Sequence, residues 1–165
     1  MDKRTRMRNK KINPQGFTLI ELLVVVAIIA LLSSIALVSL QNSRQKSRDT
    51  RRLADMATMN SALELFHADN KGYPGSGGGV PVGLTPSYAS TVATAPPTAD
   101  GVCIGLLNPV DATKSANMYY YEATGTSQVV NGITVYPDYN YYFCLGAKTG
   151  NFDPGLRYMK PSGVR

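Results

Sequence analysis

The first long hydrophobic pattern in the chain is an almost unbroken apolar run over residues 17–40. Glu21 is its one ionisable side chain. Because no polar face interrupts the run, it suits surroundings that are apolar on every side. As a helix it would rise about 36 Å, which is enough to cross a hydrocarbon core of about 30 Å.

The pattern becomes one-sided over residues 41–71, a stretch with no Gly or Pro. Apolar side chains from Leu53 to Phe66 recur at spacings of three and four, which indicates an amphipathic helix. We therefore predict one continuous helix of roughly 55 residues. Gly72 is its expected left-handed cap, and Pro74 prevents the helix from resuming. The arginines between residues 44 and 52 are expected on its solvated or interhelical faces.

Strand patterns follow a Gly-rich and Pro-rich region. Residues 75–79 (GSGGG) predict a flexible link, and residues 80–116 an irregular surface excursion. The runs 118–123 and 139–145 are rich in aromatic residues and predict strands. Asn131-Gly132, between β-branched residues, predicts a type I′ hairpin.

These elements predict an α+β fold in which one long N-terminal helix packs on a small antiparallel sheet. A sheet of three or four strands gains a core only by covering the apolar stripe of residues 53–66. The 10 tyrosines are expected to pack within that sheet, and His67, the only histidine, to be solvated or to cap the helix.

The charge of the chain belongs to its start. Residues 1–16 hold six Lys or Arg side chains against Asp2, and outside them 11 basic residues face 10 acidic ones. This distribution argues against nucleic-acid binding. A basic segment before an apolar helix places the N-terminus in the cytoplasm and the remainder outside it. A secretory signal peptide would have a shorter apolar core and a cleavage site after that core, so it is not favoured.

Two cysteines, Cys103 and Cys144, both follow the apolar helix. If that side of the membrane is extracytoplasmic, they can form a disulfide. The alternative is a pair of buried, reduced thiols.

The run QGFTLIELLVVVAII, residues 15–29, resembles the processing signature of type IV prepilins and type II secretion pseudopilins. A second, shorter resemblance joins Arg48-Asp49-x-Arg51-Arg52 to Asp69–Pro74. It is similar to the helix end of G-like major pseudopilins. The resemblance covers residues 10–74. It implies that a prepilin peptidase cuts after Gly16 and that the new amine of Phe17 is methylated.

Glu21 has an assembly role in the family that the chain resembles. A carboxylate in an apolar helix costs roughly 2–3 kcal/mol on insertion scales, so such residues normally have a partner. After cleavage the amine of Phe17 would lie one helical turn before Glu21. The resemblance implies that this pairing aligns neighbouring subunits. Many type IV pilins have a helix-breaking Pro near the position of Val38. This chain has none there, so the sequence does not decide whether the helix kinks.

The resulting organisation has four segments: a removable basic leader (1–16), a transmembrane or filament-core helix (17–40), an amphipathic helix half (41–72), and an extracytoplasmic loop and sheet region (73–165). We expect a structural, non-enzymatic subunit of a type IV pilus or a type II secretion pseudopilus. The alternative is a minor pilin that displays residues 73–165 to bind DNA, a glycan or a surface.

The resemblance also implies the partners and the location. They are a prepilin peptidase, copies of the chain and other pilins, an inner-membrane assembly platform, a cytoplasmic ATPase and membrane lipid. The chain would be a single-pass protein of the bacterial inner membrane and then part of a periplasmic or surface filament. No cofactor is expected. The resemblance to major pseudopilins implies a calcium site, however, for which Asp138 and Asp153 are candidates. The sequence leaves open pilus or pseudopilus, and major or minor subunit.

Overall fold

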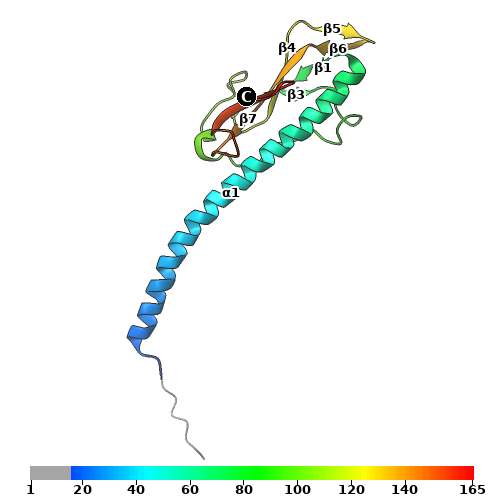
Figure 1. The fold of residues 1–165 in the computed structure, drawn as a ribbon. Helices are drawn as coiled ribbons and strands as arrows, with labels where there is room; N and C mark the ends of the chain where they lie inside the picture. Colours follow the sequence, from blue (N-terminus) through cyan, green and yellow to red (C-terminus); the bar gives the residue numbers. More distant parts are fainter. Residues whose placement is uncertain (1–15) are drawn as a thin grey trace, which may run out of the picture. The chain divides into compact units, whose positions relative to one another are not determined.

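The computed structural model describes residues 16–165, so most of the predicted leader lies outside the described residues. One long helix, α1 (Leu19–Asn70), confirms the predicted continuous helix (Figure 1). The chain divides into two compact units between Leu40 and Gln41. Over the described part of the first unit every residue is exposed. Within residues 16–165, α1 is long and apolar enough to cross a membrane.

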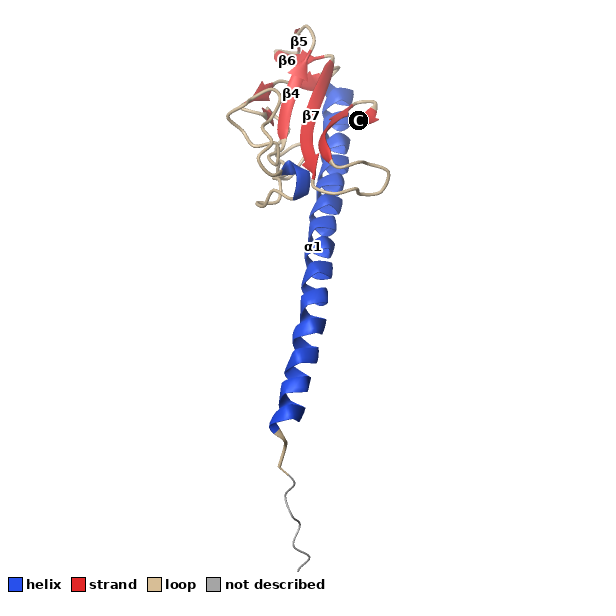
Figure 2. Cartoon of the chain, turned by 90° about the vertical axis from the view of Figure 1, so that its left-hand side faces the viewer, coloured by secondary structure: helices blue, strands red, loops and turns tan. Residues whose placement is uncertain are grey.

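The second unit contains three small antiparallel sheets (Figures 1 and 2). The largest has four strands in the order β4-β7-β8-β9. Its strands are β4 (Tyr120–Thr124), β7 (Asp138–Leu145), β8 (Gly155–Lys160) and β9 (Gly163–Val164). The second has the order β1-β6-β5, with β1 (Tyr73–Pro74), β6 (Ile133–Tyr136) and β5 (Gln128–Val130). The third pairs β2 (Ser76–Gly77) with β3 (Val80–Pro81). A 3-10 helix, η1 (Gly101–Cys103), precedes β4.

The aromatic runs and the hairpin are confirmed, but their assembly differs from the prediction. β4 covers most of the first predicted run and β7 contains the second, and Asn131 and Gly132 both have the positive φ that a type I′ turn requires. However, β6 pairs with β1 instead of joining the four-stranded sheet. The strands β8 and β9 were not predicted, because residues 155–164 hold few β-branched residues.

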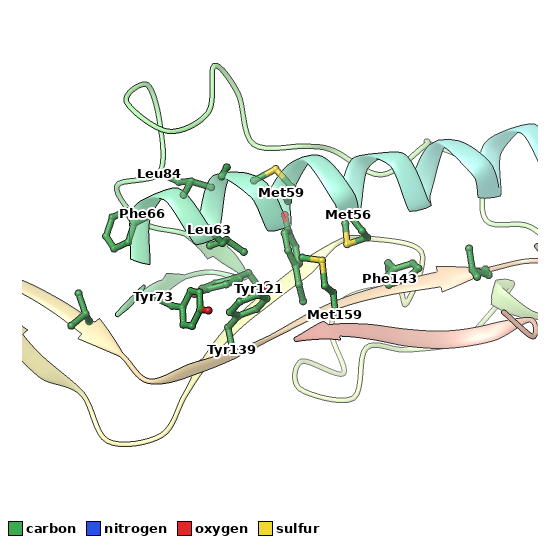
Figure 3. Packing of buried hydrophobic residues seen from close by; sticks show 14 residues of the cluster. Met56, Met59, Leu63, Phe66, Tyr73, Leu84, Tyr121, Tyr139, Phe143 and Met159 are labelled. Atoms are coloured by element: carbon green, nitrogen blue, oxygen red, sulfur yellow. The ribbon is translucent and has the colours of Figure 1, made fainter. Parts of the chain in front are cut away.

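The core lies between the second half of α1 and the sheets, where apolar helix residues meet tyrosine rings (Figure 3). Met56, Met59, Leu63 and Phe66 are buried on the predicted stripe. They face buried side chains of the strands: Tyr73, Tyr121, Val135, Tyr139, Tyr141, Phe143, Leu145 and Met159. Edge-to-face contacts join several rings, with centroids 4.8 Å apart for Tyr73 and Tyr139. The predicted packing of tyrosines within the sheets is therefore confirmed.

Tyrosine hydroxyls also anchor the sheets to α1, a role that the sequence did not predict. The hydroxyls of Tyr73 and Tyr139 donate hydrogen bonds to Glu64 (2.9 Å) and Asn60 (2.8 Å). Tyr119 bonds Asp55 in the same way, at 2.8 Å. Burial, followed by the hydrogen bond to Glu64, raises the pKa of Tyr73 above its ordinary value, which keeps the hydroxyl a donor.

The predicted flexible link at residues 75–79 is wrong, because these glycines form an ordered hairpin. Gly78 and Gly79 turn between β2 and β3 with positive φ, at no steric cost to glycine. The Gly79 carbonyl accepts a hydrogen bond from the Tyr121 N–H at 2.7 Å. Residues 80–116 have little regular structure, as predicted, but Leu84 and Cys103 are fully buried.

The predicted cap at Gly72 is also wrong. Lys71 has the left-handed backbone (φ 61°), and its N–H donates to the His67 carbonyl at 2.8 Å. Gly72 has a different role, since β6 passes close to its backbone. A Cβ at Gly72 would lie 2.8 Å from the Val135 Cβ.

Gly72→Ala should therefore destabilise the fold. A methyl group at 2.8 Å from Val135 overpacks the site, which costs about 1–3 kcal/mol. Gly75→Ala is the matched control, since its Cβ would meet Tyr136 only at an ordinary 3.4 Å. Denaturant unfolding of the full chain in detergent measures both changes. Equal free energies of unfolding for the two variants would show that the close approach of β6 is unimportant.

Candidate functional site

The predicted processing site lies just before the helix. Gly16, Phe17 and Thr18 have no regular structure, and the Phe17 side chain is 88% exposed. No described atom would lie within 4 Å of a Cβ at Gly16. The peptide bond after Gly16 is therefore outside the helix, where an enzyme can reach it. Processing at this bond stays a prediction.

Glu21 has a partner that the sequence analysis missed. Its carboxylate accepts hydrogen bonds from the Thr18 N–H (2.9 Å) and hydroxyl (2.7 Å), and the Glu21 N–H donates to the Thr18 hydroxyl (3.3 Å). This reciprocal pair is a capping box that satisfies the first turn of α1. The pattern Thr-x-x-Glu in the sequence was the available signal. In the uncleaved chain Thr18, rather than Phe17, satisfies the carboxylate.

The surface around Glu21 is apolar. A shallow depression there is lined by Phe17, Ile20, Glu21, Val24 and Val25. Contact with another apolar surface at this point would bury the carboxylate together with its neighbours. A buried carboxylate requires a positive or hydrogen-bonding partner.

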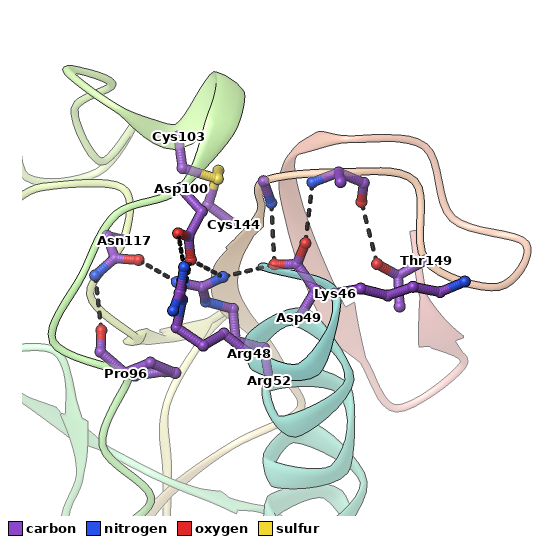
Figure 4. Close-up of polar contacts among 12 residues, drawn as sticks. Lys46, Arg48, Asp49, Arg52, Pro96, Asp100, Cys103, Asn117, Cys144 and Thr149 are labelled. Carbon is purple, nitrogen blue, oxygen red and sulfur yellow. Dashed lines mark hydrogen bonds and ion pairs between the residues drawn. A yellow bond between two sulfur atoms is a disulfide. The ribbon is translucent and has the colours of Figure 1, made fainter. Parts of the chain in front are cut away.

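One arginine of α1 does not lie on a solvated or interhelical face, as was predicted for the arginines between residues 44 and 52. Arg52 is completely buried rather than solvated, and it lies in a cluster of polar side chains (Figure 4). Its Nη1 donates to Asp49 at 2.5 Å, and its Nη2 donates to the Thr98 carbonyl at 3.0 Å and to Asn117 at 2.6 Å. Burying a guanidinium is costly unless its N–H groups are paired. These contacts pair the two terminal nitrogens, whereas the buried Nε has no hydrogen-bond partner among the described residues.

Two aspartates balance the two arginines of this cluster. Asp49 is also completely buried and accepts hydrogen bonds from the N–H groups of Gly146 (3.0 Å) and Ala147 (2.9 Å), after β7. Asp100 accepts a fork of two hydrogen bonds from Arg48. Hydrogen bonding to Arg48 lowers the pKa of Asp100, and burial opposes that shift. The cluster therefore ties three distant segments to one stretch of α1.

The predicted disulfide is confirmed beside this cluster. Cys103 of η1 and Cys144 of β7 are bonded, and both are fully buried (Figure 4). The bond closes a loop with a sequence separation of 41 residues. A loop of that length stabilises a fold by about 4 kcal/mol in the chain-entropy model. The bond therefore holds η1, which follows Asp100, against the sheet.

The two calcium candidates do not come together. Asp138 begins β7, whereas Asp153 precedes Gly155, which pairs with Leu145 at the other end of β7. The steps from Asp138 to Leu145 along the eight-residue strand separate these ends by about 23 Å. Each carboxylate is near a lysine instead, Asp138 with Lys160 (3.7 Å) and Asp153 with Lys148 (3.9 Å). Among residues 16–165, no group of three or more His, Cys, Asp or Glu side chains is placed to hold a metal.

Replacing the buried arginine should be far more damaging than replacing its neighbour. Arg52→Met leaves Asp49 buried without its counter-ion, at about 3–5 kcal/mol. Arg51→Met removes only an exposed ion pair with Asp55 (3.9 Å), worth less than about 1 kcal/mol. Unfolding of both full-length variants in detergent gives the comparison. Similar losses would mean that the cluster contributes no more than a surface pair.

Acid should weaken the fold partly through Asp100. Its folded pKa lies below the ordinary value of 3.8, so the unfolded chain binds the proton first as pH falls. The stabilisation is therefore present above about pH 4 and is lost as pH falls through the folded pKa. Asp100→Asn should remove this contribution, so the stability difference between wild type and variant should shrink with acid. A difference that is constant from neutral to acid pH contradicts the assignment.

Comparisons with known proteins show which part of the chain is similar to them. Residues 12–37 match the family described as the prokaryotic N-terminal methylation motif. The chain is 33% identical over 60 residues to "Type II secretion system core protein G" of Pectobacterium carotovorum subsp. carotovorum, covering 36% of this chain and 38% of the relative. It is 35% identical over 66 residues to the protein of that name from Vibrio cholerae, covering 39% and 45%.

A differently named relative gives a longer match. "Prepilin peptidase-dependent protein D" of Escherichia coli is 37% identical over 84 residues, covering 49% of this chain and 58% of the relative. No solved structure matches. The chain thus matches less than half of the length of the secretion relatives. These matches confirm the predicted resemblance: the amino-terminal segment carries the N-terminal methylation motif and is similar to that of type IV pilins and pseudopilins, among them G-type pseudopilins.

Proposed function

We propose that the chain is a filament subunit of a type II secretion pseudopilus. In this role it is cut after Gly16, methylated at Phe17 and assembled through its apolar helix. One observation carries the proposal: the whole apolar half of α1 is exposed, and it holds the Glu21 carboxylate one turn after the cleavage point. An exposed apolar helix of this length needs lipid or other helices around it.

The surroundings of the two halves of α1 support this assignment. Residues 19–40 present apolar side chains on all faces, whereas residues from Asp49 onward bury one face against the sheets. Before assembly, lipid would cover the first half. In the filament, the same half would pack against helices of other subunits, so one apolar environment replaces another.

The orientation follows from charge and from the cysteines. The basic residues of 1–16 would hold the N-terminus on the cytoplasmic side of the inner membrane. The region after α1 would then be extracytoplasmic, where a disulfide such as Cys103–Cys144 persists. A prepilin peptidase, an assembly platform and a cytoplasmic ATPase would act on the chain from the membrane and cytoplasm.

The choice between pseudopilus and pilus rests on the relatives. Proteins named as core protein G of type II secretion match in several bacteria, among them Pectobacterium and Vibrio. A pseudopilus subunit is expected to be nearly absent from a sheared surface fraction of cells. Low abundance of this chain in a sheared surface fraction would agree with it, whereas dominance of that fraction would identify a major pilin instead.

Processing should leave a mature chain that begins at Phe17. We expect the intact mass of protein taken from cells to fall by the mass of residues 1–16 and to rise by one methyl group. Deleting the prepilin peptidase should restore the full-length mass. A chain that keeps its first 16 residues, or one that is cut after residue 40, would overturn the proposed function.

Glu21→Ala should abolish or sharply reduce filament assembly without unfolding the second unit. Membrane insertion should become easier, because the change removes a charge from an apolar segment. In a filament, however, the Phe17 amine would be buried without a counter-charge, at several kcal/mol per subunit.

Ser33→Ala is the matched control, since it removes a polar group from the same exposed helix without removing a charge. Membrane-inserted precursor, processed subunit and sheared filament are compared for each variant. Normal filament yield from Glu21→Ala would remove Glu21 from the assembly mechanism.

A further inference from the structure

The second unit presents an apolar groove that the rest of the unit leaves open. The groove has a volume of about 330 Å³ and lies between the segment 92–97 and the residues just before β4. None of its described lining residues is charged, and most are apolar, among them Val80, Val92, Pro96, Met118, Tyr119 and Tyr141. Val80 and Met118 remain 45% and 49% exposed, so the groove has apolar surface to bury.

The walls of this groove are fixed by hydrogen bonds. Asn117 donates to the Pro96 carbonyl at 2.9 Å and accepts from Arg52, so the groove is built on the buried cluster of Figure 4. On the opposite wall the Gly79 carbonyl is bonded to the Tyr121 N–H. The groove therefore exists before any partner arrives, and a preformed surface costs little ordering on binding.

The same unit also exposes a set of apolar side chains on the segment 102–110, which we call the apolar loop. Five of its nine residues are apolar and exposed: Val102, Ile104, Leu106, Leu107 and Val110. None of the nine lines the groove, and none is charged. The apolar loop is thus a second surface, separate in its residues from the groove.

The backbone of the apolar loop is held in one conformation. Cys103 is fully buried in the disulfide with Cys144. Leu107 forms an isolated antiparallel bridge with Ser115. Buried Asn108 accepts hydrogen bonds from the two N–H groups that follow Pro109. These contacts hold the apolar side chains outward without help from a partner.

The apolar loop and the groove suit one another in size and charge. A cavity of about 150 Å³ can hold a benzene molecule, so the groove has room for the side chains of Ile104 and Leu107. Because neither surface carries a charge, their contact would bury none. Asp111 directly follows the loop, and exposed Arg51 lines the depression that shares residues 92–94 with the groove. Opposite charges beside an apolar contact favour one register.

A second copy of the chain is the partner that brings both surfaces together. A copy that places its loop in the groove of a neighbour leaves its own groove free for the next copy. Such a head-to-tail contact does not close and builds an open row of subunits. Each contact is small, but helices packed side by side would hold the second units at a high effective concentration.

We propose that the apolar loop of one subunit docks in the groove of the next, with Ile104 and Leu107 as the inserted side chains. The contact adds a link between second units to the packing of the apolar helices. This inference rests on the filament subunit of the proposed function, and the experiment below distinguishes the failure of one from the failure of the other.

Photocrosslinking in cells tests the contact with the full-length chain. The photoreactive amino acid p-benzoylphenylalanine replaces Thr94, which is exposed and lines the groove. Thr126, which is exposed and lies outside the groove, is replaced in the same way as the control. After irradiation, the crosslinked products of the envelope fraction are separated by mass, and the joined peptides are identified by mass spectrometry.

We expect the Thr94 reporter to give dimers and, in smaller amounts, trimers and larger products that join residue 94 to the apolar loop of another copy. The Thr126 reporter should not capture that loop. Adding Leu107→Gln should lower the dimer yield about tenfold or more, because a leucine side chain loses its burial. Val129→Gln, at a residue 72% exposed on β5, should leave the yield unchanged.

Several results would overturn the docking. They are a crosslink to the loop of the same chain, capture of lipid or of an unrelated protein in its place, and a yield that Leu107→Gln does not lower. Products that end at the dimer would show a closed, reciprocal pair and contradict the head-to-tail row. Thiol labelling of the denatured, unreduced Leu107→Gln chain checks that the Cys103–Cys144 bond has formed. Ile104→Gln, under the same check, replaces Leu107→Gln if it has not.

The mass of the uncrosslinked chain from the same cells tests the proposed function separately. A chain that begins at Phe17 but gives no loop-to-groove crosslink overturns the docking and leaves the proposed function in place. A crosslinked series from a chain that keeps its first 16 residues supports the docking and overturns the proposed function. Failure of both measurements overturns both.

Discussion

The buried guanidinium of Arg52 is the interaction on which the rest of the second unit depends. It donates hydrogen bonds to the Asp49 carboxylate on its own helix, and to the Thr98 carbonyl and the Asn117 side-chain oxygen in the loop region. Asp49 in turn holds the chain that follows β7. A buried charge is tolerated only while its partners stay in place, so these contacts fix three segments on one helix turn. The disulfide then lies beside a rigid support.

Because the Arg52 cluster holds the sheets and loops on the second half of α1, the two halves of this helix have different surroundings. From Asp49 onward the helix buries one face under tyrosine rings, whereas from Gly16 to Arg44 every residue is exposed. The first half is thus available to lipid or to other helices without any cost to the sheet core. Within residues 17–40 Glu21 is the one ionisable side chain, and Thr18 satisfies it in the uncut chain. Cleavage would supply a stronger, charged partner in the Phe17 amine.

Local sequence patterns predicted the helix and the main strands. Contacts between segments distant in sequence determined the features that the sequence could not predict. The apolar run, the stripe from Met56 to Phe66 and the Asn131-Gly132 turn were all predictable, because periodicity and turn chemistry are local. The burial of Arg52 was not, since its partners at Thr98 and Asn117 are distant in sequence and show no pattern of their own. The role of Gly72 depends on the approach of β6, which is again a distant segment. At the candidate site, Gly16, Phe17 and Glu21 came from the resemblance, while the capping role of Thr18 was visible in the sequence and overlooked.

The most direct test of the central claim is an electron cryomicroscopy map of filaments that contain this chain, at a resolution that shows side chains. We expect the first residue of each subunit to be Phe17, with its methylated amine within hydrogen-bond distance of a Glu21 carboxylate from its own or a neighbouring subunit. The apolar half of α1 should be buried among other helices. A subunit that begins before Phe17, or a Glu21 that contacts only Thr18 while the Phe17 amine faces solvent, would contradict this mechanism of assembly.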